Sequence, residues 1–93
     1  MEKLTNRILL IDDNLDNLTI MADLIQHAFP GYGILSASSG LKGLALAASD
    51  DPDVILLDVV MPGMNGFEVC QKLKSNPKTS LIPVVFLTSL KGD

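Results

Sequence analysis

Three apolar runs in this chain each end in a side chain that can do chemistry. The runs cover residues 8–11, 54–57 and 84–87, and the polar residues that directly follow them are Asp12 and Asp13, Asp58, and Thr88. Short continuous apolar runs are typical of strands buried in a parallel sheet, and in an open parallel sheet the ends of such strands lie side by side. We therefore expect three carboxylates and one hydroxyl to meet at one edge of a sheet.

Carboxylates that lie close together repel one another, and a divalent cation is the natural way to hold them. Aspartate is ionised near neutral pH, so one of the three can also attack a phosphoryl group without a base to activate it. The pattern thus predicts a metal site that offers one carboxylate as a phosphoryl acceptor. The residues alone leave simpler interpretations open, in which Asp12 and Asp13 cap a helix, Asp58 belongs to a turn and Thr88 is an ordinary strand residue.

Composition predicts one small globular domain over residues 1–93. Hydrophobic residues make up 47% and charged residues 19% of the chain, and the net charge of −4 argues against a surface that binds nucleic acid directly. Cys70 is the only cysteine, so no internal disulfide can form. The apolar stretches are too short to span a membrane and residues 1–6 lack an apolar signal core, so we expect a soluble cytoplasmic protein.

Strand and helix patterns alternate along the chain, which positions the chemical residues. Strands are expected at residues 8–11, 32–37, 53–58 and 82–88. A first helix follows a cap at Asp13 or Asn14 and stops before Pro30, a second lies between residues 38–40 and 50–52, and a third runs from about 66 to 75. This βαβαβαβ order predicts a parallel sheet with helices on both faces.

The spacing of apolar residues also predicts which helix faces are buried. Those faces carry Leu15, Leu18, Ala22, Ile25 and Phe29 in the first helix, Leu41, Leu44, Ala45 and Ala48 in the second, and Phe67, Cys70 and Leu73 in the third.

The acidic pair and the segment after Asp58 resemble a known family. Asp12-Asp13 is similar to the acidic pair of response-regulator receiver domains from two-component systems, and the segment 58–66, DVVMPGMNG, resembles their D-x-x-M-P-x-M-x-G phosphorylation loop. Leu87-Thr88-Ser89 resembles their fourth strand, which ends in Thr or Ser. The resemblance covers the whole chain and implies a flavodoxin-like, doubly wound parallel sheet with strand order 2-1-3-4.

The resemblance also implies a role for each chemical residue. Asp58 takes a phosphoryl group from a histidine kinase or phosphotransfer protein, which makes the chain a phosphoprotein in a phosphorelay rather than a conventional enzyme. Mg²⁺, or Mn²⁺, is held by Asp13, Asp58 and the carbonyl of Val60, with Asp12 bound directly or through water. The Thr88 hydroxyl donates to the phosphoryl group, and the signal passes to an output domain.

The family's fold goes on to a fourth helix, a fifth strand and a fifth helix, and this chain stops at Asp93. We therefore expect a receiver truncated before its fifth strand, which self-associates to cover the open edge of its fourth strand. Lys91 is too close to Thr88 to be the family's phosphate-binding lysine.

Two rival interpretations belong to other classes. One is a receiver-like interaction module that is never phosphorylated. The other is a metal-dependent phosphatase, which usually has a second Asp two residues after the nucleophile, where this chain has Val60.

Overall fold

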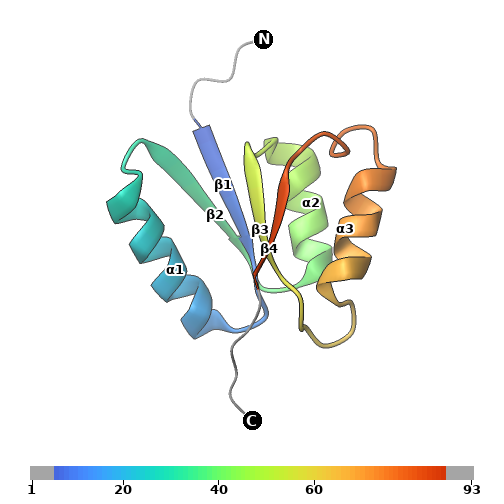
Figure 1. Ribbon diagram of the computed structural model, residues 1–93, viewed down its shortest axis with the longest axis horizontal. Coiled ribbons are helices and arrows are strands. Elements are labelled where there is room, and N and C mark those ends of the chain that lie inside the picture. The colour runs from blue at the N-terminus through green and yellow to red at the C-terminus, as the bar shows by residue number, and fades with distance from the viewer. Residues whose placement is uncertain (1–5, 88–93) are drawn as a thin grey trace.

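The computed structural model describes residues 6–87 as a four-stranded parallel sheet with three helices (Figure 1). In chain order the elements are β1 (Asn6–Ile11), α1 (Leu15–Ala28), β2 (Tyr32–Ala37), α2 (Gly40–Asp50), β3 (Val54–Asp58), α3 (Gly66–Ser75) and β4 (Val84–Leu87). The strand order is β2-β1-β3-β4, which confirms the predicted α/β class and the order 2-1-3-4. Within this range no helix has the length and apolar character needed to cross a membrane.

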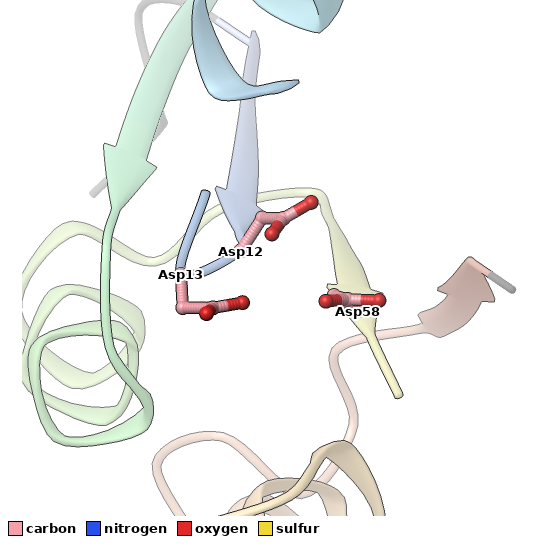
Figure 2. A group of neighbouring side chains, drawn as sticks. All are labelled: Asp12, Asp13 and Asp58. Atoms are coloured by element: carbon pink, nitrogen blue, oxygen red, sulfur yellow. The ribbon is translucent and has the colours of Figure 1, made fainter. Parts of the chain in front are cut away.

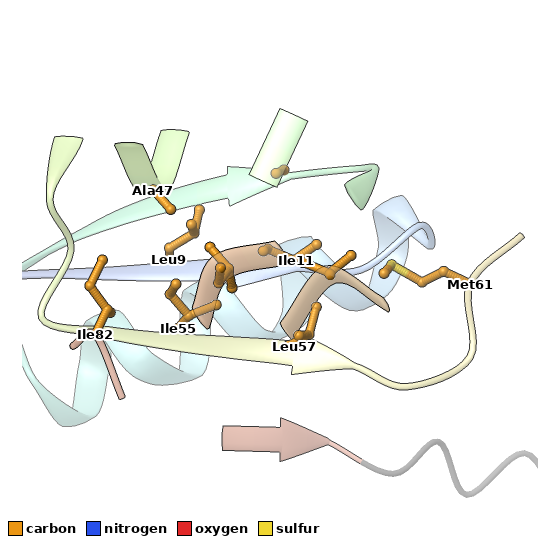
Figure 3. Packing of buried hydrophobic residues seen from close by; sticks show 10 residues of the cluster. Leu9, Ile11, Ala47, Ile55, Leu57, Met61 and Ile82 are labelled. Atoms are coloured by element: carbon orange, nitrogen blue, oxygen red, sulfur yellow. The ribbon is translucent and has the colours of Figure 1, made fainter. Parts of the chain in front are cut away.

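The sheet lies between two layers of helices, with α1 on one face and α2 and α3 on the other (Figure 1). Successive side chains of a strand point to opposite faces, so each central strand supplies both layers. Leu9 and Ile11 of β1 join Leu57 of β3 in the larger core under α2 and α3 (Figure 3). Ile8 and Leu10 pack with Leu18 of α1 on the other face.

The buried face of α2 matches the predicted one only in part, because Leu44 packs against the larger core as expected but two other predicted residues do not. Leu41 and Ala45 are exposed, whereas Gly43 and Ala47 are buried against the sheet. A Cβ atom on Gly43 would lie 2.8 Å from Cγ1 of Ile11, so the helix backbone rests directly on β1. The prediction was wrong at Leu41 and Ala45 because it ranked positions by hydrophobicity, whereas this close approach requires the smallest residues.

Helices α1 and α3 also expose residues that were predicted to be buried. Leu15 is 67% and Phe29 is 53% exposed, and Leu18 is the buried residue of α1. In α3, Phe67 is 59% exposed because its ring packs instead on Phe86 of β4, with ring centroids 5.1 Å apart. The face of α3 that meets the core is centred on Val69 and Leu73, beside a partly buried Cys70.

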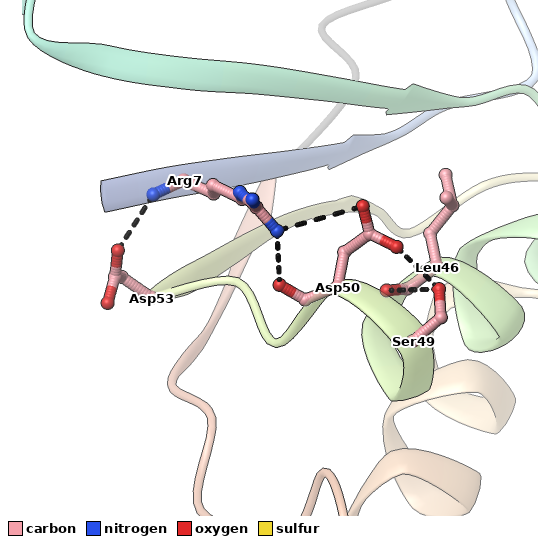
Figure 4. Close-up of polar contacts among 5 residues, drawn as sticks. All are labelled: Arg7, Leu46, Ser49, Asp50 and Asp53. Carbon is pink, nitrogen blue, oxygen red and sulfur yellow. Dashed lines mark hydrogen bonds and ion pairs between the residues drawn. The ribbon is translucent and has the colours of Figure 1, made fainter. Parts of the chain in front are cut away.

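Arg7 ties the start of β1 to the segment that leads into β3 (Figure 4). Its backbone N–H donates to Oδ2 of Asp53 at 2.8 Å, and the backbone N–H of Asp53 donates to the Arg7 carbonyl at 2.8 Å. Its guanidinium donates to the carbonyl of Asp50 at 3.0 Å. These bonds fix where β3 begins relative to β1, at the end of the sheet opposite Asp12 and Asp58.

Gly43→Ala should destabilise the fold by about 1–3 kcal/mol, because the added methyl group overpacks a contact with the buried Ile11 side chain. Urea unfolding followed by circular dichroism measures this loss. Gly31→Ala is the matched control, since a Cβ atom there meets nothing within 4 Å. Equal stability of the two variants would contradict the close packing of α2 on β1.

Candidate functional site

The register between β1 and β3 brings the three aspartates together. Ile11 pairs with Leu57, so the residues that follow, Asp12 and Asp58, leave the sheet at the same level. One carboxylate oxygen from each of Asp12, Asp13 and Asp58 lies within 4.8 Å of the others. Figure 2 shows the carboxylates of Asp13 and Asp58 pointing into the same space beyond the strand ends. The predicted cluster of acids therefore forms.

The two adjacent acids have different surroundings. Both oxygens of Asp12 accept hydrogen bonds, Oδ1 from the backbone N–H of Asn14 at 3.0 Å and Oδ2 from the side-chain amide of Asn17 at 3.4 Å. Oδ1 of Asp13 is buried and has no hydrogen-bond partner among residues 6–87. A buried carboxylate oxygen without a donor is costly, so this atom lacks the partner that a bound ligand would supply.

A divalent cation fits this donor set. At a separation of about 5 Å, two unit negative charges repel by about 3 kcal/mol at an effective dielectric constant of about 20, and a cation between them reverses the sign of the interaction. Carboxylate oxygens are the ligands that Mg²⁺ and Mn²⁺ prefer. Asp12 and Asp58 are only 6% and 3% exposed, so bulk water screens their charges poorly.

The segment between β3 and α3 is anchored directly to Asp58. A Cβ atom on Gly66 would lie 2.9 Å from Cα of Val59 and would collide with the Asp58 carbonyl oxygen, so only glycine allows α3 to start this close to the strand. Asn65 caps α3 in a reciprocal pair with Glu68, and each side chain accepts from the other residue's backbone N–H. Met61 is buried in the larger core and so holds this segment against the sheet.

Of the other two predicted site residues, the structure describes Val60 but not Thr88. The side chain of Val60 is 60% exposed and carries no ligand atom, so only its carbonyl can bind a metal. Thr88 lies outside the described residues; the residue before it, Leu87, pairs with Asp58 in the sheet.

Asn14 and Asn17 are site residues that sequence reasoning did not assign. Asn14 was one of two predicted caps for α1, and its side chain does accept from the backbone N–H of Asn17 at 3.1 Å. The contact of Asn17 with Asp12 was missed, because it joins the third helical residue to an acid five positions earlier. An amide in the first turn of a helix that follows an acidic pair is the signal that could have revealed it.

Comparison with known proteins gives the same family throughout. A model of the response regulator receiver domain family matches residues 8–93. Response regulator PleD of Caulobacter vibrioides is 48% identical over 92% of this chain, which spans only 18% of PleD. Protein PilH of Pseudomonas aeruginosa is 39% identical over 89% of this chain, which spans 67% of PilH.

Solved structures agree with the sequence comparisons. The N-terminal domain of a response regulator receiver protein from Methanoculleus marisnigri JR1 superposes with a TM-score of 0.83 at 33% identity, over 88% of this chain and 65% of that one.

Asp13→Asn should weaken binding of Mg²⁺ or Mn²⁺ by about tenfold or more, since one charged oxygen ligand is lost. Calorimetric titration measures the affinity. Asp16→Asn is the matched control, because Asp16 is an exposed acid of the same segment and lies outside the cluster. If Asp13→Asn binds as tightly as the parent, the assignment of Asp13 as a ligand is wrong.

Proposed function

The chain belongs to the response regulator receiver domain family, and from this premise we propose that it is a phosphoacceptor domain that receives its phosphoryl group on Asp58. The observation that carries the proposal is the meeting of Asp12, Asp13 and Asp58 within 4.8 Å at the ends of adjacent parallel strands. The donor is a phosphohistidine of a histidine kinase or a phosphotransfer protein.

Asp58 acts as the nucleophile. One of its carboxylate oxygens attacks phosphorus, the P–N bond to the donor imidazole breaks, and the imidazole leaves with the electron pair and takes up a proton from water. The buried position of Asp58 supports this role, because its backbone is paired with Leu87 of β4 and the residue before it, Leu57, is paired with Ile11 of β1. Contact of its carbonyl with Gly66 further limits movement of the acceptor.

Mg²⁺, or Mn²⁺, would be held by Asp13, Asp58 and the carbonyl of Val60, with Asp12 as a ligand either directly or through water. The unpartnered Oδ1 of Asp13 supports this ligand set, because it is a buried acceptor with capacity to spare. When bound, the metal neutralises negative charge on the carboxylates and on the phosphoryl oxygens.

Thr88 is proposed to donate its hydroxyl proton to a phosphoryl oxygen. Its place in the sequence supports this role, since it directly follows Leu87, the partner of Asp58 in β4. Relay of the signal to an output domain is proposed as well, on the ground that this chain matches only 18% of PleD and leaves room there for other domains.

Asp58→Asn should abolish phosphorylation, because an amide is a poor nucleophile. Incubation with acetyl phosphate and Mg²⁺, followed by intact-mass spectrometry, should show one base-labile phosphoryl group on the parent and none on the variant. Asp51→Asn, at the opposite end of β3, is the control and should label like the parent. Labelling of the Asp58→Asn variant would rule out this acceptor, and a parent that binds Mg²⁺ without being labelled would favour the unphosphorylated interaction module.

We also propose that the chain self-associates through β4. Among the described strands, β4 pairs with β3 alone, and Val85 and Phe86 are 47% and 38% exposed. An exposed strand edge offers unpaired backbone groups to a second chain.

Val85→Lys should shift the protein toward monomers, since a charged side chain at a strand edge disfavours pairing with another strand. Light scattering over a range of protein concentrations measures the change. Ile20→Lys, at a comparably exposed apolar position on α1, should leave association unchanged. A parent that is monomeric even at high micromolar concentration would refute self-association.

A further inference from the structure

Asn17 is bonded twice to the segment that carries the acidic pair. Its backbone N–H donates to Oδ1 of Asn14 at 3.1 Å, and its side-chain amide donates to Oδ2 of Asp12 at 3.4 Å. The backbone N–H of Asn14 in turn donates to the other oxygen of Asp12 at 3.0 Å. The start of α1 and the Asp12 carboxylate thus form one hydrogen-bonded unit.

The hydrogen bonds of this unit involve Asp12 and not Asp13. Both oxygens of Asp12 have a donor, which sets the rotation of its carboxylate before any ligand arrives. Oδ1 of Asp13 is buried without a donor among the residues that the structure describes. Each oxygen of an ionised carboxylate can accept two hydrogen bonds, so the donors on Asp12 leave it with capacity toward the site.

We propose that Asn17 is a positioning residue, which holds the Asp12 carboxylate in the orientation that the metal site needs. This inference rests on the proposed function. Without the amide, one oxygen of Asp12 is free to rotate toward other donors, and metal binding must then restore the orientation at a cost in affinity.

The chemistry of an amide suits this position. A lysine or arginine would also donate to Asp12, but its positive charge would repel the cation. An aspartate would add a fourth negative charge and could not donate. An amide donates without a charge, and the partly buried setting of Asn17 makes that donation more effective than it would be in water.

The test compares metal affinity with metal-free stability in Asn17→Leu, which removes the donor and keeps the branching and the number of heavy side-chain atoms. The affinity for Mg²⁺, from a titration followed by NMR, should fall by about threefold to tenfold, at the low end of the usual range because the 3.4 Å bond is long. The unfolding temperature without metal should stay within a few degrees of the parent's, since leucine forms helices better than asparagine.

Gln26→Leu is the matched control, because it makes a similar amide-to-leucine change on an exposed site of the same helix. It should leave the Mg²⁺ affinity unchanged. If Asn17→Leu binds Mg²⁺ as tightly as the parent does, the positioning role is overturned, whereas the proposed function is not affected. The positioning role is also overturned if the loss of Mg²⁺ affinity is fully explained by a loss of stability that the variant already shows without metal. A parent that binds no Mg²⁺ would overturn the metal site itself, and the positioning role with it.

Discussion

Parallel pairing of β1 with β3 sets the level at which two strands end, and the site is built on that level. Ile11 lies beside Leu57, so Asp12 and Asp58 emerge together at the edge of the sheet. A slip of one residue would move an acid by about 3.3 Å and turn it to the opposite face. The apolar side chains of both strands, alternating between two cores, oppose such a slip because it would move each of them into the opposite core, where different side chains are packed. Packing of the core and geometry of the site therefore depend on one register.

The same register concentrates negative charge that the fold only partly compensates. Asp12 receives two protein donors, whereas Asp13 presents a buried oxygen that none of the described residues satisfies. The stability supplied by the core lets the chain keep this locally unfavourable arrangement, which the proposed cation and phosphoryl group would relieve. Contact between Gly66 and the Asp58 carbonyl extends the rigidity to the following segment.

Backbone architecture could be predicted from the sequence more completely than side-chain burial. Continuous apolar runs and turn residues predicted the bounds 32–37 and 66–75, whereas the strand order 2-1-3-4 was predicted from the family resemblance. The buried face of α2 was mispredicted in part, because Gly43 has no hydrophobic signal and only its contact with β1 reveals its importance. The acids could be located because they end strands. The bond from Asn17 to Asp12 could not, since it depends on how the helix leaves the strand.

The hydrogen bonds of Arg7 with Asp53 have a consequence for the changes in length that this chain can accommodate. They fix the first residue of β3 against β1, so an insertion in the connection between β2 and α2, at residues 38–39, would be absorbed before the strand begins. A length change within β3 has no such buffer and would move Asp58 out of the site. An insertion at residues 38–39 should therefore leave the site in place, whereas an insertion between Asp53 and Asp58 should disrupt it.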